Sequence, residues 1–268
     1  MGTSDRTPVF EDTLGDRQFA TTLARGLEVL RCFTPEEPIL GNKELSDRTG
    51  LPRPTISRFT YTLVLLGYLR HSSNSNKYEL GSATVSLGYP MLARVRIRQV
   101  VRPGMNELAD LYGCSVSMGI RDRLGIVYVE TSRSRAVFAP QFSDIGRWLP
   151  IAGSSTGHAY LAACDRTERE GILNEIRVKT PEAWKEYSRA IERSMKEFAR
   201  TGFCILNEHR YKGVRAVAVP LKRPFDGERI VFNCVANVDH LGKGTLENQI
   251  GPRLVAFVRA IEASLKTI

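Results

Sequence analysis

The sequence predicts an α+β protein with an N-terminal winged helix-turn-helix domain, a linker helix and a C-terminal α/β domain with a mainly antiparallel sheet. Three observations support this prediction. Three helical segments come first, with a tight turn between the second and third, and a Ser/Asn-rich hairpin follows them. A helical stretch comes next, and Pro90 within it predicts a kink or break. Beyond about residue 102, strand-like runs occur in pairs among further helices.

The N-terminal helices are predicted from apolar spacing and from end signals. Residues 18–33 repeat apolar side chains at helical intervals. Residues 40–50 predict a short helix with Asn42 as its N-cap and Gly50 just past its end. A third helix follows within a few residues. Two short β-type runs around a Ser/Asn-rich loop then complete the wing.

The turn before the third helix reads GLPRPTISRF, with two prolines on either side of Arg53. Proline fits the first turn of a helix and disfavours α geometry in the residue before it. We therefore expect Pro54 at the first helical position and Arg53 just outside the helix. The apolar side chains expected to face inward along this helix are Ile56, Phe59, Leu63 and Leu66.

This third helix is the expected recognition helix, since the second helix of such a motif enters the major groove of DNA. Helical geometry turns Ser57, Arg58 and Tyr61 outward, and Arg58 can bind a guanine edge or a phosphate. Residues near the helix start and in the wing are expected to set the register through phosphates. The candidate DNA contacts are Lys43, Arg53, Thr55, Ser57, Arg58, Tyr61 and Lys77.

Composition limits the class of protein. The chain of 268 residues is 42% hydrophobic and 25% charged, as in globular proteins, and carries a net charge of +9 spread over both halves. This charge permits a nucleic-acid partner without requiring one. The sequence contains no run of 18 apolar residues, so it predicts no membrane span. Residues 1–17 are expected to be a flexible segment without a leader. Five cysteines without a C-x-x-C pair indicate reduced thiols and a cytoplasmic protein.

Several motifs follow one another in the order of a known family. LARGLEVLRCF, ELSDRTGLPRPTISRFTYTLVLLGYL and YELGSATVSLGY precede GRWLPIAGSSTGHAYLAA, TGFCILNEHRYKGVRAVAVPL and FNCVANVDH. Over about residues 18–265 the chain resembles the IclR family of bacterial transcriptional regulators. The resemblance implies a GAF/profilin-like effector domain, a small organic acid as effector, no cofactor and no enzymatic activity. It also implies a homodimer or homotetramer on a palindromic operator in double-stranded DNA.

The expected domain limits combine these readings. Residues 18–81 are the expected DNA-binding domain, residues 82–98 the linker helix, and residues 99–268 the effector-binding domain. The linker helix is also expected to help the protein dimerise.

One motif offers an alternative function. Residues 153–157, GSSTG, match the G-x-S-x-G elbow of α/β-hydrolases, and Ser155, Asp226 or Asp239, and His240 follow in triad order. A serine hydrolase or esterase is therefore the alternative. Against it, Pro150 interrupts the strand that should precede the elbow, and the paired strands differ from a parallel hydrolase sheet.

The same stretch suits a carboxylate site better. Ser154, Ser155 and Thr156 precede an apolar helix, whose free N–H groups and hydroxyls favour an anion. Met118 and Trp148, with Phe142, are expected to form an aromatic-lined wall nearby, which favours an aromatic acid. By resemblance, the effector contacts are Ser155, Thr156, Asn207, Val214, Ala216, Asn237 and Asp239.

The four histidines do not form a metal-ligand spacing. The pairs Glu208–His209 and Asp239–His240 could meet in space, but we expect surface or capping roles and no metal.

Overall fold

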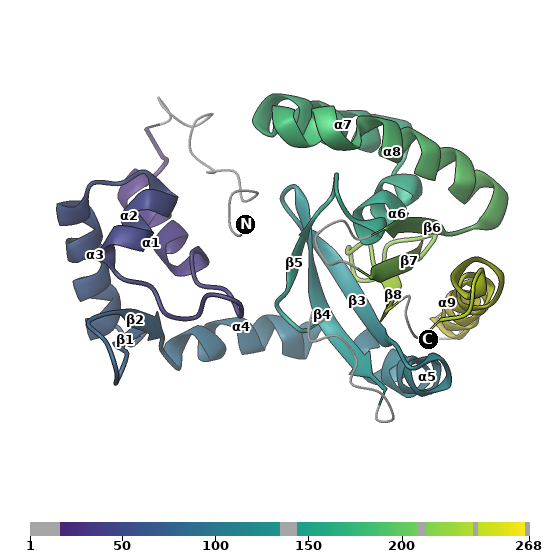
Figure 1. Cartoon of the computed structure of the whole chain (residues 1–268), viewed down its shortest axis with the longest axis horizontal. Helices are drawn as coiled ribbons and strands as arrows, with labels where there is room; N and C mark the ends of the chain where they lie inside the picture. Colours follow the sequence, from purple (N-terminus) through teal and green to yellow (C-terminus); the bar gives the residue numbers. More distant parts are fainter. Residues whose placement is uncertain (1–16, 135–143, 208–212, 238–240, 266–268) are drawn as a thin grey trace. The chain divides into compact units, whose positions relative to one another are not determined.

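The computed structural model describes residues 17–134, 144–207, 213–237 and 241–265 (Figure 1). The chain divides into two compact units, residues 1–94 and 95–268. The N-terminal segment up to residue 16 and Phe142 lie outside the described residues, as do the pairs Glu208–His209 and Asp239–His240.

The N-terminal unit confirms the predicted winged helix-turn-helix. Its helices are α1 (Thr21–Arg31), α2 (Asn42–Thr49) and α3 (Arg53–Leu65), followed by the antiparallel wing strands β1 (Leu69–His71) and β2 (Tyr78–Leu80) and by α4 (Ala83–Arg94). The segment before α2 also joins the wing, because Leu40 exchanges two backbone hydrogen bonds with Tyr78. The buried core of this unit consists of Val29, Cys32, Phe33, Leu40, Leu45, Ile56, Leu63 and Leu69.

Helix α2 begins one residue earlier than its predicted cap requires. Gly41 is the N-cap, and its N–H donates to the Glu44 carboxylate at 3.1 Å, so that Asn42 is already helical. The expectation that Asn42 caps the helix is therefore wrong. The end of the helix is as predicted, since Gly50 adopts a left-handed φ of 69°.

Helix α3 begins one residue earlier than predicted. The carbonyl of Pro52 accepts the first helical hydrogen bond from Ile56 N at 3.1 Å, so Pro52 is the N-cap and Arg53 the first helical residue. Pro54 stands at the second position, where its missing N–H has no intrahelical partner to lose. Leu66 does not join the inward stripe, because the helix ends at Leu65 and leaves it 60% exposed.

The linker helix α4 continues past Pro90, where we expected a kink or break. The helix ends at Arg94, and α5 (Ile97–Tyr112) begins after two residues. Proline removes one helical hydrogen bond to the residue four positions earlier, which here is Ser86. Because Ser86 and Pro90 are both exposed, water can satisfy the carbonyl that is left.

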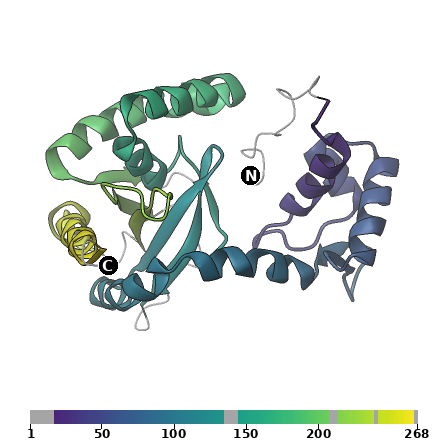
Figure 2. The same cartoon turned by 180° about the vertical axis from the view of Figure 1, so that it is seen from behind.

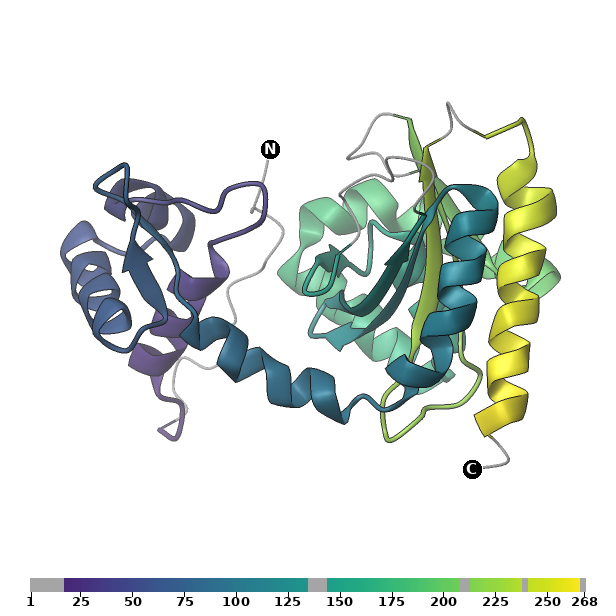
Figure 3. The same cartoon turned by 90° about the horizontal axis from the view of Figure 1, so that it is seen from below.

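The C-terminal unit is built on a six-stranded antiparallel sheet in the order β5-β4-β3-β8-β7-β6. Helices α6, α7 and α8 lie on one side of it, and α5 and α9 lie side by side on the other (Figures 1, 2 and 3). The elements are β3 (Ser115–Asp122), β4 (Gly125–Arg133), β5 (Trp148–Pro150), α6 (Ser155–Ala163), α7 (Arg166–Lys179), α8 (Pro181–Thr201), β6 (Cys204–Asn207), β7 (Val214–Pro220), β8 (Val231–Asn237), the π-helix η3 (Leu246–Ile250) and α9 (Gly251–Leu265).

The strand register separates the two faces of this sheet, because side chains alternate along a strand and paired residues share a face. Asn233 pairs with Ala218, which packs in the core cluster formed with α6, α7 and α8. We call this face the α6 face. Met118 pairs with Phe232, whose ring meets Phe257 of α9 edge-on at 5.5 Å. We call this opposite face the α5 face.

The start of α6 packs closely against the strand that precedes it. Ser154 caps the helix, since its Oγ accepts from Gly157 N at 3.0 Å and donates to the Pro150 carbonyl at 2.7 Å. A Cβ at Gly157 would lie 2.3 Å from the Ile151 carbonyl oxygen. Only glycine fits this approach. The glycine of the GSSTG motif therefore has a packing reason that is independent of any nucleophile.

His158 fixes α6 on its other side. It is fully buried, with Nε2 2.7 Å from the Ala152 carbonyl and Nδ1 2.8 Å from Ser194 Oγ of α8. A carbonyl only accepts, so Nε2 carries the proton and Nδ1 accepts from the serine hydroxyl. Burial lowers the pKa of His158 to about 4, although the bond to Ala152 opposes this shift.

The buried histidine predicts a pH-dependent stability. His158 is neutral in the folded chain down to about pH 4, whereas in the unfolded chain it takes up a proton near its ordinary pKa. Its contribution is therefore complete above about pH 6.5 and is lost as the pH falls. Between pH 7 and pH 5 we expect a loss of about 2 kcal/mol from this group. Urea unfolding followed by tryptophan fluorescence measures it, because Trp148 and Trp184 both lie in the C-terminal unit.

His158→Gln should remove this dependence, and His71→Gln, which changes an exposed wing residue, should keep it. A difference in unfolding free energy between wild type and His158→Gln that stays constant from pH 7 to pH 5 would contradict the assignment.

Candidate nucleic-acid interface and ligand site

The outward side of α3 carries the residues expected there. Ser57, Arg58 and Tyr61 are exposed, with Tyr61 at 67%. Arg53 is also exposed at the helix start. Within the part of the chain that the structure describes, the guanidinium groups of Arg53 and Arg58 have no hydrogen-bond or ion-pair partner. These cations are therefore available to an external anion.

A hydrogen bond between α2 and α3 orients this surface. Asn42 Nδ2 donates to Ser57 Oγ at 3.0 Å, and Thr60 Oγ1 donates to the Ile56 carbonyl at 3.0 Å beneath it. Thr55 is half-buried, and Lys43 is exposed on α2. The structure thus brings the candidate contacts of the two helices to neighbouring positions, and it gives Asn42 a bridging role that the sequence did not reveal.

Lys77 differs from the other candidates because it is already paired. Its ammonium binds the Glu44 carboxylate, which also accepts from Gly41 N. The bond from Lys77 lowers the pKa of Glu44. Lys77 therefore links the wing to α2 in the free protein and is less available for a phosphate than Lys43.

The second candidate site lies where the N-terminus of α6 meets the sheet. Ser155 and Thr156 are fully buried, and neither hydroxyl has a partner among the described residues. Both residues precede the first hydrogen bond of the helix, from His158 N to the Ser154 carbonyl. A buried hydroxyl without a partner destabilises the fold, so this position favours an acceptor from outside the chain.

The α6 face of the sheet supplies further polar groups. Asn233 Nδ2 donates to the Tyr128 hydroxyl at 2.6 Å, while its Oδ1 is buried without a partner among the described residues. Ser117 pairs with Asn233, and the hydroxyl oxygens of Ser117 and Thr131 lie 3.0 Å apart. Sequence reasoning missed this set. Its signal was the alternation of polar residues along β3 and β8, as in Ser115 and Ser117.

Several residues implied by the resemblance lie on this face. Val214 pairs with Asn237, and Ala216 pairs with Val235, with which it forms a small apolar cluster. Asn207 pairs with Arg215 in β7, and this register position belongs to the opposite α5 face. Asp239 lies outside the described residues.

Met118 and Trp148 do not join the site, which corrects the expected aromatic wall. Met118 lies on the α5 face, because it pairs with Phe232. Trp148 pairs with Val127 on the same side, where its ring lies over Gly125 and its Nε1 donates to the Asp122 carbonyl at 3.3 Å. Gly125 leaves room for this ring, because a Cβ there would lie 2.0 Å from it.

The geometry does not support a hydrolase. Ser155 opens a helix that follows an edge strand of an antiparallel sheet, whereas the elbow requires a buried parallel strand. The histidine nearest to Ser155 in sequence is His158, and both of its ring nitrogens form hydrogen bonds within the fold. Among the described residues, no group of three side chains could hold a metal ion.

Comparisons with known proteins agree with this architecture. The family model of the IclR helix-turn-helix domain matches residues 22–73, and that of the bacterial transcriptional regulator IclR C-terminal domain matches residues 90–239. The regulator TsaQ1/TsaQ2 of Comamonas testosteroni is 32% identical over 91% of this chain and 88% of its own length. The Pca regulon regulatory protein of Pseudomonas putida is 25% identical over 91% and 84%.

Solved structures show the same likeness. An IclR family transcriptional regulator from Brucella abortus is 43% identical, with a TM-score of 0.81 over 96% of this chain and 98% of that one. An IclR homologue from Microbacterium hydrocarbonoxydans, solved with 4-hydroxybenzoate, is 21% identical, with a TM-score of 0.62 over 89% and 99%, and shows the fold. The chain therefore belongs to the IclR family of bacterial transcriptional regulators, and it is a DNA-binding regulator rather than an enzyme.

Proposed function

We propose that this regulator senses a small aromatic acid and controls genes for the catabolism of such acids. The observation that carries the proposal is the pair of buried hydroxyls at the start of α6, Ser155 and Thr156, which have no hydrogen-bond partner among the residues that the structure describes. A carboxylate placed there would accept from both hydroxyls and from the first free amides of the helix.

The aromatic part of the proposal rests on relatives and on one side chain. The p-hydroxybenzoate hydroxylase transcriptional activator of Acinetobacter baylyi is a relative whose name points to aromatic acids, as does the 4-hydroxybenzoate bound to the Microbacterium hydrocarbonoxydans protein. In this chain Tyr128 is a buried aromatic residue on the α6 face, with its hydroxyl bonded to Asn233. Val214 and Ala216 on that face carry small apolar side chains, which suit contact with a ring.

On DNA, we propose that Arg58 reads a base and that Lys43 and Arg53 contact phosphates. Arg58 stands in the second turn of α3 and is exposed without a protein partner in the described chain. Thr55, Ser57 and Tyr61 complete the proposed surface. Two such surfaces on a palindromic operator require at least a dimer.

The linker helix supports self-association. No residue of α4 is buried, and Val85, Leu87 and Tyr89 are 71%, 62% and 66% exposed. Apolar side chains gathered on one helix at this exposure mark a surface that a partner covers. We therefore include α4 in the dimer interface of the proposed regulator.

Substitution of Arg58 tests base reading. Arg58→Ala should weaken binding to an operator selected from random duplexes by about 1–3 kcal/mol and relax the preference at one base position. Arg53→Ala should weaken binding to all duplexes alike and reduce its salt dependence. Fluorescence anisotropy at several salt concentrations measures both effects. The control is Arg189→Ala, which makes the same charge change at an exposed position of α8. Equal losses on selected and random DNA for Arg58→Ala would contradict base reading.

Removal of the buried hydroxyls tests the effector site. Ser155→Ala and Thr156→Val should lower the affinity for benzoate or 4-hydroxybenzoate about tenfold, because each removes a donor to the carboxylate. Neither should reduce thermal stability, since these hydroxyls have no hydrogen-bond partner among the described residues. Ser154→Ala is the matched control, because loss of this cap should lower stability by about 1 kcal/mol. Calorimetric titration that finds pyruvate bound, and neither aromatic acid, would refute the aromatic assignment.

Charges on α4 test the proposed interface. Val85→Glu combined with Tyr89→Glu should shift the dimer toward monomer, because two carboxylates would be desolvated on association. Sedimentation velocity at micromolar concentration measures the change. Thr84→Glu, at a half-buried neighbouring position, is the control for charge alone. An unchanged sedimentation coefficient for the double variant would exclude α4 from the interface.

A further inference from the structure

A pocket lies at the turn between β3 and β4, away from the site proposed for the effector. It is an open hollow of about 350 Å³ between that turn, the last turns of α6, the first turn of α7 and the loop before β8. It is lined by Arg121, Arg123, Tyr160, Glu168, Pro224, Gly227, Glu228 and Arg229. We propose that this pocket is a second ligand site, which binds a small multiply charged oxyanion such as a phosphate group or a dicarboxylate.

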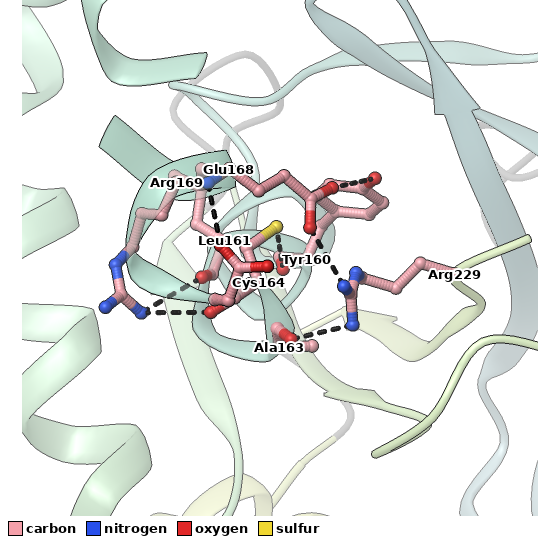
Figure 4. Close-up of polar contacts among 8 residues, drawn as sticks. Tyr160, Leu161, Ala163, Cys164, Glu168, Arg169 and Arg229 are labelled. Carbon is pink, nitrogen blue, oxygen red and sulfur yellow. Dashed lines mark hydrogen bonds and ion pairs between the residues drawn. The ribbon is translucent and has the colours of Figure 1, made fainter. Parts of the chain in front are cut away.

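The inner wall of the pocket is a closed set of polar contacts (Figure 4). Glu168 accepts from the Tyr160 hydroxyl at 3.0 Å and from Arg229 Nη2 at 2.8 Å, while Arg229 Nη1 donates to the Ala163 carbonyl at 2.7 Å. Burial raises the pKa of Glu168, but the bonds from Arg229 and Tyr160 outweigh it and lower that pKa below its ordinary value. The Glu168 charge is therefore present and already neutralised by Arg229.

Arg121 supplies a guanidinium group that takes no part in the contacts of the inner wall. Its Nε donates to the Arg123 carbonyl at 2.7 Å, and its guanidinium lies 6.0 Å from the centre of the Tyr160 ring. Within the described residues, its terminal nitrogens bond to no protein acceptor. Arg229 adds a buried Nε that also has no acceptor there. Guanidinium groups whose N–H groups point into a pocket without a protein acceptor favour an oxyanion.

The turn itself positions a third guanidinium. Arg123 has a φ of 55°, which glycine adopts at less cost than arginine. The side chain kept at this strained position lines the pocket and lies 3.6 Å from the carboxylate of Asp122. Because Arg229 neutralises Glu168, Arg121 and Arg123 are the remaining cations of the lining, with Asp122 beside Arg123 and exposed Glu228 at the rim.

This pocket is separate from the site at the start of α6. Tyr160 follows Ser155 by five residues, or roughly 7.5 Å along a helix. Arg121 lies near the end of β3, whereas Ser117 lies near its beginning. Besides Tyr160, the lining consists of charged residues, Pro224 and Gly227, which suits a compact anion with several oxygens better than an aromatic ring.

Titration of the full-length protein with inorganic phosphate, succinate and benzoate tests the proposal by calorimetry. We expect saturable binding of phosphate or succinate, weakened about tenfold or more by Arg121→Gln, because that change removes charged donors. The fold should persist, since Arg121 donates to one carbonyl only; circular dichroism and the melting temperature check this. Arg259→Gln makes the same charge change at an exposed position of α9 and should leave the affinity unchanged.

The outcomes separate the two ligand sites. Ser155→Ala should not alter phosphate or succinate affinity, and Arg121→Gln should not alter benzoate affinity. Phosphate binding alone identifies a phosphoryl ligand, and succinate binding alone identifies a dicarboxylate. Absence of saturable binding of both at millimolar concentrations overturns the proposal, as does equal affinity of Arg121→Gln and Arg259→Gln.

Discussion

The packing of α6 between the sheet and α8 is the constraint on which the C-terminal unit depends. All residues from Ser155 to Leu161 are buried, so this helix has no side that faces water. Gly157 lets its backbone approach Ile151, and His158 ties it to Ala152 and to Ser194. Because it is packed on every side, the helix cannot move to bring the hydroxyls of its first turn within reach of hydrogen-bond partners. Within the described chain, the hydroxyls of Ser155 and Thr156 therefore have no hydrogen-bond partner, which costs roughly 1–3 kcal/mol each. Their positions are fixed before any ligand arrives.

The N-terminal unit depends on smaller connections. Its core is a single cluster, and polar contacts link the surrounding elements. Asn42 joins α2 to α3, and Glu44 joins the start of α2 to Lys77 of the wing. These contacts use the polar groups that hold the motif together and leave Arg53 and Arg58 in water. A surface whose cations have no internal partner binds DNA phosphates without first breaking an ion pair.

The sequence predicted the order and type of the elements because each depends on local signals. Apolar spacing marked the helices, Gly50 marked the end of α2, and the strand pair around residues 123–124 was marked by its turn. The first residues of α2 and α3 were displaced by one position, since a capping preference does not decide between neighbours when Gly41 or Pro52 can also serve.

Tertiary features were harder to predict, since strand parity decides which face a residue occupies. Met118 stands beside a register shift between β3 and β4, and a shift of one residue moves a side chain to the other face. Spacing alone therefore could not exclude it from the ligand site. The bond between Asn233 and Tyr128 joins residues 105 positions apart, and no local pattern indicates it. Arg121, Glu168 and Arg229 also meet only through the fold.

Strand β4 is the element that connects the α6 face to the helix that follows the linker. Its consecutive residues Glu130 and Thr131 point to opposite faces. Thr131 shares a hydrogen bond with Ser117 on the α6 face, while Glu130, only 2% exposed, binds Arg98 at 3.0 Å and Arg102 at 2.8 Å on α5. A buried carboxylate held by two cations resists displacement, because separating them would leave an unpaired charge. Glu130 therefore holds β4 to α5, which is the first helix after the linker.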